Sequence, residues 1–141
     1  MNNRTFAIIK PDAVKNGDTG KIYDRILKAD FNILSAKLLR MTKAQAKEFY
    51  DVHNERPFFD ELTDFMSSGA CMLLALEKDN AVSEWRKTIG ATNHEEAEAG
   101  TIRKDFATNI QENAVHGSDS NENAEKEIGF FFSDSELIAN K

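Results

Sequence analysis

The sequence contains only one cysteine, Cys71, so no disulfide can form within the chain. Cys71 lies inside an apolar run, where its side chain is expected to pack as a small buried hydrophobe. No apolar stretch approaches the ~18 residues that a membrane-spanning helix needs, and the first residues do not fit a signal peptide. We therefore expect a cytoplasmic protein that has no membrane partner.

Positive charge is also in deficit. The chain carries 18 Lys and Arg against 24 Asp and Glu, which gives a formal net charge of -6. Non-specific binding to nucleic acid requires a basic face, so this balance argues against a nucleic-acid partner. A small polyanion is still a possible ligand, because a few well-placed cations can dominate a pocket locally.

Proline is scarce, and no repeat, linker or low-complexity tract divides the chain. A length of 141 residues is common for one domain and is enough to bury a core without disulfides or a structural metal. We expect a single domain over residues 1–141.

Four segments predict strands: residues 5–9, 33–41 and 70–76, and a short one at 113–116. The third is apolar on both alternating faces, as a central strand covered on both sides would be. Helical patterns separate these strands. The order predicts a ferredoxin-like split βαβ sandwich, with an antiparallel four-stranded sheet covered by helices.

Apolar spacing and end signals predict the helices. The residues expected to face inward are Ile22, Tyr23, Ile26 and Leu27 in the first helix, Phe58, Leu62, Phe65 and Met66 in a later one, and Val82, Trp85 and Ile89 in the next. Starts are expected at Thr42 (with Gln45 in a capping box), at Pro57, at Asn80 and at Asp119 or Ser120, and ends at Gly69, Gly90 and Gly129. Residues 91–115 predict a long loop with a helical turn near 101–106.

The sequence has no glycine-rich loop that cradles phosphate. The segment Gly17-Asp18-Thr19-Gly20-Lys21 lacks the four-residue gap of a P-loop, and no G-x-G-x-x-G occurs, so an ordinary turn is expected there. Any phosphate must therefore be held by side chains. Lys10, Arg86 and Arg103 are candidates, although each taken singly is more often a surface charge.

Among the three histidines, His116 has the most distinctive surroundings. His53 and His94 lie among polar residues and are expected to be exposed. His116 precedes Gly117-Ser118-Asp119, in which the glycine would let a bulky substrate approach and the next two side chains could orient the ring. No H-x-x-x-H or C-x-x-C pattern supports metal binding, and a lone histidine is more often structural than catalytic.

Several separate motifs along the sequence, taken together, resemble one known family. The segment Asn113-Ala114-Val115-His116-Gly117-Ser118-Asp119-Ser120 closely resembles the active-site signature of the nucleoside diphosphate kinase family. The similarity extends over essentially the whole chain, through Arg4-Thr5-Phe6-Ala7-Ile8-Ile9-Lys10-Pro11-Asp12, Arg56-Pro57-Phe58-Phe59, Gly100-Thr101-Ile102-Arg103 and Ala124-Glu125-Lys126-Glu127-Ile128-Gly129.

The resemblance implies a phosphotransferase that works through a phosphohistidine. His116 would attack the γ-phosphorus through Nδ1, while Glu127 accepts a hydrogen bond from the other ring nitrogen and Ser118 orients that pair. The remaining roles implied are phosphate binding by Lys10, Arg86, Thr92 and Arg103, ribose binding by Lys10 with Asn113, shaping of the pocket by Tyr50, base stacking by Phe58, and flanking of the base by Leu62. Phe59 would then face inward, with Phe58 at the mouth of the pocket.

The resemblance also implies ligands and assembly. The substrates would be nucleoside di- and triphosphates, and Mg²⁺ would bridge phosphate oxygens without direct protein ligands. A homo-oligomer is implied, with a hexamer favoured over a tetramer. His94 and Ala99 stand where family members often carry loop prolines, which leaves subunit contacts and thermal stability open.

Three other functions are open at this point. A binding or regulatory protein without turnover would be indicated by loss of the nucleophile or of a phosphate-holding arginine, and all of these are present. A phosphohistidine donor to another protein would use the same His116, and turnover with a free nucleoside diphosphate separates that case. A metal-dependent nuclease is disfavoured, because the sequence shows no obvious carboxylate cluster.

Overall fold

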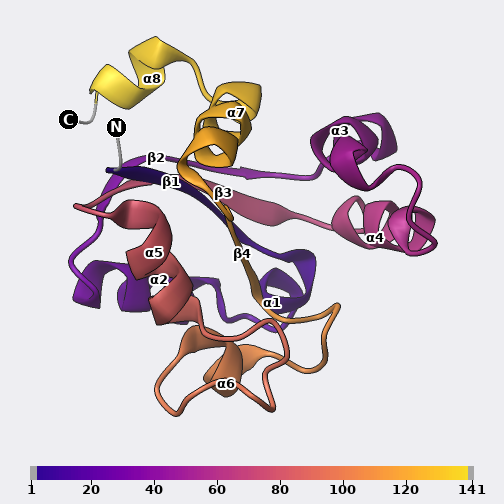
Figure 1. The fold of residues 1–141 in the computed structure, drawn as a ribbon, viewed down its shortest axis with the longest axis horizontal. Helices are drawn as coiled ribbons and strands as arrows, with labels where there is room; N and C mark the ends of the chain where they lie inside the picture. Colours follow the sequence, from indigo (N-terminus) through magenta and orange to yellow (C-terminus); the bar gives the residue numbers. More distant parts are fainter. Residues whose placement is uncertain (1–2, 140–141) are drawn as a thin grey trace.

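A four-stranded antiparallel sheet forms the centre of the protein (Figure 1). The computed structural model describes residues 3–139. The strands are β1 Arg4–Ile9, β2 Asn32–Leu39, β3 Cys71–Glu77 and β4 Val115–Gly117, arranged in the order β2-β3-β1-β4. This order and the antiparallel pairing confirm the expected ferredoxin-like sandwich, with β3 and β1 in the middle.

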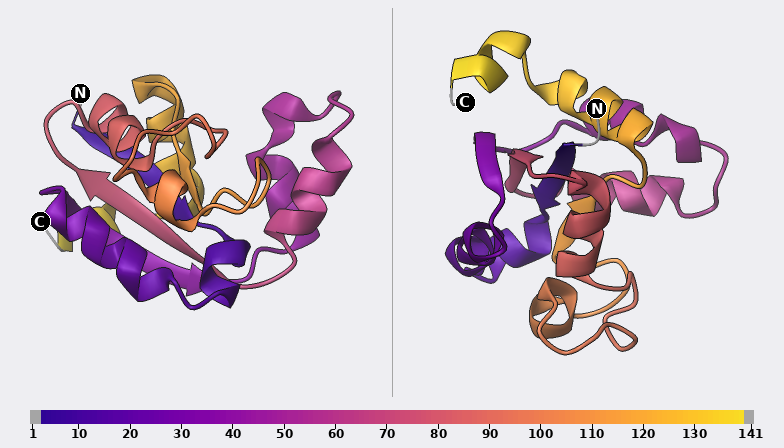
Figure 2. Two further views of the ribbon diagram at one scale, coloured as in Figure 1. Left: turned by 90° about the horizontal axis from the view of Figure 1, so that it is seen from below. Right: turned by 60° about the vertical axis from the view of Figure 1, so that its left-hand side comes forward.

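Helices cover the sheet in two layers (Figures 1 and 2). They are α1 Pro11–Lys15, α2 Thr19–Lys28, α3 Lys43–Phe49, the 3-10 turn η1 Asp51–His53, α4 Phe59–Met66, α5 Ala81–Ile89, α6 Ile102–Phe106, α7 Asn121–Phe131 and α8 Asp134–Ala139. Helices α2, α5 and α6 lie on one side of the sheet and α7 on the other, while α3 and α4 form a hairpin that projects beside it. Among residues 3–139, no helix has the length and apolar character needed to cross a bilayer.

Strand β1 has apolar side chains on both faces, so the sheet needs a layer of helices on each side. Its side chains alternate between two apolar clusters, with Ala7 and Ile9 on the side of α2 and α5, and Phe6 and Ile8 on the side of α7. All four are fully buried. A strand buried on both faces is continuously apolar, which is the pattern that the sequence showed for this segment and for β3.

Several predicted helix ends are wrong by a few residues. α4 begins at Phe59, because the chain first closes tight turns in which Arg56 N donates to His53 O and Phe59 N donates to Arg56 O. The same helix ends at Met66, before Gly69. Asn80 does occupy the N-cap of α5, but with φ of 55° its side chain makes no capping hydrogen bond.

The C-terminal helix is also longer than the sequence predicts. Gly129 lies inside α7, which continues to Phe131, and α8 follows it without having been predicted. Phe131 stacks on Phe6 with ring centroids 5.8 Å apart, and Phe132 is buried in the same cluster. This burial outweighs the cost of about 1 kcal/mol for one helical glycine.

Two residues that helical spacing alone predicts to face inward are exposed. Leu27 is 50% exposed, because α2 buries only the stripe that contains Ile22 and Ile26. Phe58 is 47% exposed and lies in the connection between α3 and α4, whereas the next residue, Phe59, packs against the apolar cluster that contains Tyr50. Trp85 and Met66 are fully buried, whereas Tyr23, Leu62 and Phe65 are partly buried and pack against the two apolar clusters.

Replacing Thr42 tests the capping of α3. Its side chain accepts a hydrogen bond from Gln45 N at 3.0 Å, and Gln45 Oε1 accepts one from Thr42 N at 2.9 Å. Thr42→Ala should lower the free energy of unfolding by about 1 kcal/mol in urea denaturation. Thr88→Ala in the last turn of α5 is the matched control. The Thr88 hydroxyl only donates to Glu84 O one turn back in the same helix, so this variant should be neutral or slightly stabilising, because alanine is the better helix former. Equal losses in the two variants would contradict a capping role.

Candidate active site

His116 is the middle residue of the three-residue strand β4, which pairs with β1. Because strand side chains alternate, Val115 and Gly117 face the layer of α5, whereas His116 faces the layer of α7. The imidazole is therefore the only side chain that β4 directs toward α7. It is 20% exposed, so it is held by protein on most sides and still reachable.

Glu127 on α7 meets the histidine directly. Its Oε1 lies 2.8 Å from His116 Nε2 and also accepts a hydrogen bond of 2.9 Å from Ser118 Oγ. Ser118 is fully buried and itself accepts a bond from Phe6 N. A carboxylate accepts hydrogen bonds only, so this contact favours the tautomer with the proton on Nε2 and the lone pair on Nδ1. No hydrogen bond to Nδ1 occurs among the described residues.

Three aromatic rings surround the imidazole edge-on. The centroids of Phe49, Phe6 and Tyr50 lie 5.7, 6.1 and 6.4 Å from that of His116. Tyr50 caps the end of α3, and burial, reinforced by the charge of Glu127, raises the pKa of its hydroxyl. The rings fix the orientation of the imidazole and place Tyr50 beside it, where the sequence expected it.

Gly117 has a different role from the one that its place after His116 suggested. A Cβ at this position would lie 2.7 Å from Trp85 Cδ1 and 3.1 Å from Ile89 Cδ1. The glycine thus allows close packing of β4 on α5, and it does not open space for a substrate. Trp85 Nε1 also donates to His116 O at 3.1 Å, so α5 holds the backbone of the candidate nucleophile.

Asp119 does not orient the ring either, contrary to one expectation. Its carboxylate accepts a hydrogen bond from Asn123 Nδ2, at the start of α7. Ser120, one of the two expected N-caps, accepts from Asn123 N at 3.1 Å. The residues after Ser118 therefore begin the helix that delivers Glu127.

Lys10 and Asn113 form a buried pair at the end of β1. Lys10 Nζ donates to Asn113 Oδ1 at 2.9 Å and to Gln111 O at 3.1 Å, and Asn113 Nδ2 donates to Thr92 O at 3.2 Å. Burial lowers the pKa of Lys10 to about 8; the negative charge of Asp12 opposes this shift and Arg103 adds to it. Three candidates that lie far apart in sequence are thus linked in one network.

Arg103 on α6 is half-buried and lies against the backbone next to the histidine. Its Nη1 donates to Gly90 O and its Nη2 to Val115 O, both at 3.0 Å. Its Nε is buried without a hydrogen-bond partner among the described residues. Burial and the nearby charge of Arg86 lower the pKa of Arg103 to about 10. Arg103 therefore keeps its charge at neutral pH.

Arg86, Thr92 and Arg103 line one pocket of about 430 Å³. Gly90, Thr101 and the carboxylates Glu96 and Glu98 also line it. Gly90 has φ of 89°, and a Cβ there would lie 2.6 Å from Thr101 Oγ1, so only glycine fits between α5 and the loop. The pocket brings together three of the four residues expected to hold phosphates.

Phe58 and Leu62 come from the α3–α4 hairpin. Leu62 packs at the edge of the apolar cluster that contains Tyr50, whereas Phe58 is half exposed. The Phe58 ring lies 5.6 Å from that of His53, centroid to centroid. Neither His53 nor His94 is fully exposed as expected: both are half-buried, and His94 Nδ1 is buried without a partner among the described residues.

Two contributors were missed by reasoning from the sequence. Trp85 had been assigned only to the core, although it also bonds the backbone of His116. Asp12 had been quoted only as part of a motif, although its buried carboxylate accepts a hydrogen bond from Ala114 N at 3.1 Å. Its position directly after Lys10-Pro11 was the one local sign of a role.

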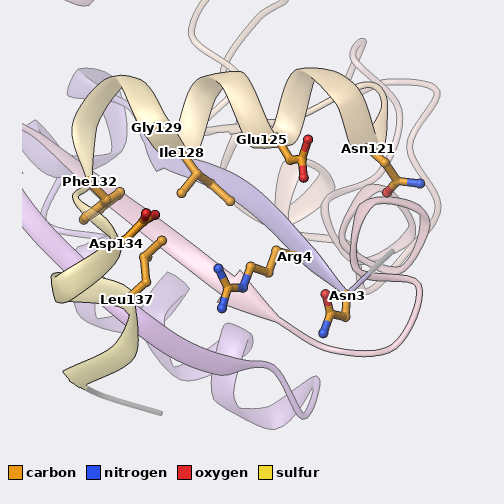
Figure 3. A pocket seen from close by; sticks show the side chains of 9 residues that line it. All are labelled: Asn3, Arg4, Asn121, Glu125, Ile128, Gly129, Phe132, Asp134 and Leu137. Atoms are coloured by element: carbon orange, nitrogen blue, oxygen red, sulfur yellow. The ribbon is translucent and has the colours of Figure 1, made fainter. Parts of the chain in front are cut away.

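A second pocket, of about 420 Å³, lies away from these residues (Figure 3). Asn3 and Arg4 at the start of β1 face Glu125 and Ile128 of α7 and Leu137 of α8 across it. None of the candidate site residues lines this pocket. The candidate active site is therefore the region around His116.

Comparison with known sequences identifies the family. The sequence model described as "Nucleoside diphosphate kinase" matches residues 3–137. This chain belongs to the nucleoside diphosphate kinase family. It is therefore a phosphotransferase that acts on nucleotides.

Curated nucleoside diphosphate kinases match over nearly their full length. The protein of Geotalea uraniireducens is 57% identical over 135 residues, which cover 96% of this chain and 98% of the relative. That of Salinibacter ruber is 53% identical over 137 residues, which cover 97% and 96%.

Solved structures of the family share the fold. The nucleoside diphosphate kinase of Aquifex aeolicus superimposes with a TM-score of 0.92 at 47% identity, covering 94% of this chain and 96% of that one. A halophilic nucleoside diphosphate kinase from Halobacterium salinarum, in complex with CDP, gives 0.91 at 36% identity, with 96% and 91% covered.

Replacing Gly117 tests whether close packing sets the position of β4. In Gly117→Ala the new methyl group must displace Trp85 or the strand, so the free energy of unfolding should fall by about 1–3 kcal/mol. Chemical denaturation measures this loss. Gly20→Ala in α2 is the matched control: its Cβ would meet nothing within 4 Å, and stability should stay or rise by up to about 1 kcal/mol. Wild-type stability in Gly117→Ala would show that the strand has freedom to shift.

Proposed function

We propose that this nucleoside diphosphate kinase transfers the γ-phosphate of a nucleoside triphosphate, mainly ATP, to a nucleoside diphosphate through a phosphohistidine at His116. The observation that carries the proposal is the contact of 2.8 Å between Glu127 Oε1 and His116 Nε2. It leaves Nδ1 as the nitrogen with a free lone pair. Ser118 supports the proposal by holding the same carboxylate oxygen.

The transfer proceeds in two balanced half-reactions. The Nδ1 lone pair forms a bond to the γ-phosphorus while the bond from that phosphorus to the bridging oxygen breaks, and the nucleoside diphosphate leaves. The ring then carries positive charge, which the carboxylate of Glu127 offsets. A phosphate oxygen of the second diphosphate attacks the phosphorus, and the N–P bond breaks to restore neutral His116. One site thus serves both substrates in a ping-pong cycle.

Side chains hold the phosphates because no glycine-rich loop is available. We assign this role to Lys10, Arg86, Thr92 and Arg103, of which the last three line one pocket. The free Nε of Arg103 and the poorly solvated ammonium of Lys10 support the assignment, since both gain a partner when an anion arrives. Cations fixed in position before the substrate binds stabilise transition-state charge at little reorganisation cost.

Mg²⁺ would enter with the nucleotide. Among residues 3–139, no group of three or more His, Cys, Asp or Glu is placed to hold a metal ion. The surrounding cations, in contrast, suit a polyphosphate that brings its own ion. When bound, Mg²⁺ would bridge phosphate oxygens and neutralise part of their charge.

We further propose broad tolerance for base and sugar. Phe58 would stack on the base with Leu62 beside it, and stacking suits every base because each has a π-face. The half-exposed ring of Phe58 at the end of the hairpin supports this role. Lys10 and Asn113, already bonded to each other, would reach the ribose hydroxyls.

Assembly, location and domain structure stay predictions. We expect a homo-oligomer, a hexamer in preference to a tetramer, in the cytoplasm. Residues 1–141 are proposed to be a single nucleoside diphosphate kinase domain.

Labelling with γ-phosphate-labelled ATP and Mg²⁺, without an acceptor, tests the phosphohistidine. The wild type should take up one phosphate per subunit, and that label should survive base and be lost in acid, as a phosphoramidate is. His116→Ala should lose the label and turnover together, whereas the matched control His94→Ala should keep both. Label that persists in His116→Ala, or kinetics that require both nucleotides to be bound at once, would falsify the mechanism.

The pH dependence tests the charge on Lys10. Because the pKa of Lys10 is lowered to about 8, its ammonium loses a proton as pH rises through that value. A neutral amine attracts phosphate less, so kcat/KM should decline on the alkaline side, by up to about tenfold per pH unit. Initial rates between about pH 7 and pH 10 measure the decline.

Lys10→Arg identifies the group responsible. A guanidinium keeps its proton to higher pH than an ammonium, so the alkaline decline should move upward in this variant. Lys28→Arg, on the exposed side of α2, should keep the wild-type profile. An unchanged decline in Lys10→Arg would mean that another group titrates.

A further inference from the structure

Asp12 is a buried carboxylate that the proposed mechanism does not use. It lies in the first turn of α1, directly after Lys10-Pro11, and is 6% exposed. Its Oδ2 accepts a hydrogen bond of 3.1 Å from Ala114 N, two residues before His116, and its Oδ1 is buried without a partner among the described residues. Burying a charged carboxylate costs free energy unless hydrogen bonds or nearby cations compensate for the lost solvation.

The partner of Asp12 is a strained residue. Ala114 has φ of 73°, in the left-handed region that a residue with a Cβ rarely adopts. Its backbone is held from two sides: Asp12 accepts from its N–H, and Lys10 N donates to its carbonyl at 2.8 Å. Strained conformations persist only where neighbouring contacts determine them. Here Val115 N donates to Asn113 O across the turn at 2.9 Å, and the bonds to Lys10 after β1 and to Asp12 in α1 hold it from outside.

The left-handed turn determines where two site residues lie. Immediately before it, Asn113 is placed between Lys10 Nζ and Thr92 O. Immediately after it, Val115 enters β4 with its carbonyl on Arg103, and His116 follows. A relaxed turn at Ala114 would therefore move Asn113 and His116 relative to each other.

The carboxylate also faces the charges of the site. Its negative charge opposes the lowering of the Lys10 pKa by burial, and Arg103 acts in the other direction. Burial raises the pKa of Asp12 itself, while Lys10 and the bond from Ala114 N lower it and Glu112 raises it. Lys10 and Glu112 are thus the charged groups that this carboxylate couples to directly, and Arg103 acts on it only through Lys10.

We propose that Asp12 is a positioning residue for phosphoryl transfer, whose carboxylate holds the left-handed turn at Ala114 and so aligns Asn113 with Lys10 and His116 with Glu127. This inference rests on the proposed role of His116. It assigns to Asp12 no contact with the substrate.

Two variants separate the hydrogen bond of Asp12 from its charge. Asp12→Ala removes both and should lower kcat/KM about tenfold or more at pH 7, mainly through kcat, because loss of a buried acceptor frees the strained turn. Asp12→Asn keeps an acceptor oxygen without the charge and should retain about half of the activity at pH 7, the loss coming only from partial deprotonation of Lys10. Its alkaline decline should begin about one pH unit lower than in the wild type, since Lys10 has lost a stabilising anion.

The hydrogen bond from Ala114 N to Asp12 can also be tested by a measurement that does not depend on activity. Hydrogen exchange at the Ala114 amide, followed by NMR, should become about tenfold faster or more in Asp12→Ala and stay near the wild-type rate in Asp12→Asn. Asp24→Asn, which removes an exposed carboxylate on α2, is the matched control and should leave all three readouts unchanged.

The outcomes distinguish this inference from the proposed function. If the wild type fails to exchange phosphate between nucleotides, the proposed function is wrong, and amide exchange still tests the contact with Ala114. If the wild type is active but Asp12→Ala equals it in kcat/KM, the positioning role is wrong. Equal losses at pH 7 in Asp12→Asn and Asp12→Ala, or an unchanged alkaline decline in Asp12→Asn, would also overturn it.

Discussion

The hydrogen bond between His116 and Glu127 is the contact on which the arrangement of the site depends. It fixes the ring tautomer, and it can form only if β4 presents His116 to α7 and not to α5. The neighbours of His116 secure that orientation, because Gly117 is packed on Trp85 and the carbonyl of Val115 is bonded by Arg103. A slip of β4 by one residue would turn the imidazole to the opposite face of the sheet.

Positively charged side chains cluster in the candidate site, although the net charge of the whole chain is negative. The protein carries a net charge of -6, yet Arg103, which bonds the carbonyl of Val115 beside His116, lies close enough to both Lys10 and Arg86 for their charges to interact. Burial lowers the pKa values of Lys10 and Arg103, which shows that these cations lack part of the solvation that water would give them. An anionic phosphate can compensate these cations for the lost solvation. Burial of Lys10 and Arg103 therefore costs free energy in the free protein but favours binding of a polyphosphate.

Reasoning from the sequence succeeded where the signal was local. The strand positions, the capping box at Thr42 and the apolar stripe of α5 follow from short-range patterns, and the structure confirms them. The predictions from sequence were wrong where tertiary packing decided the outcome. Gly129 was expected to end α7, but burial of Phe131 and Phe132 extends the helix, and no local pattern showed that Gly117 faces Trp85.

The sequence by itself determined the fold class, because alternation and helical spacing are written in neighbouring residues, and through its motifs it indicated the family and His116 as the reactive residue. The resemblance also implied Glu127 and Ser118 as its partners, but only the tertiary structure decided the contacts that no motif indicated. Trp85 of α5 bonds the carbonyl of His116, and Asp12 reaches Ala114 across 102 positions of the chain. Contacts of this kind arise from how strands and helices pack, and spacing along the chain does not encode the distance between them.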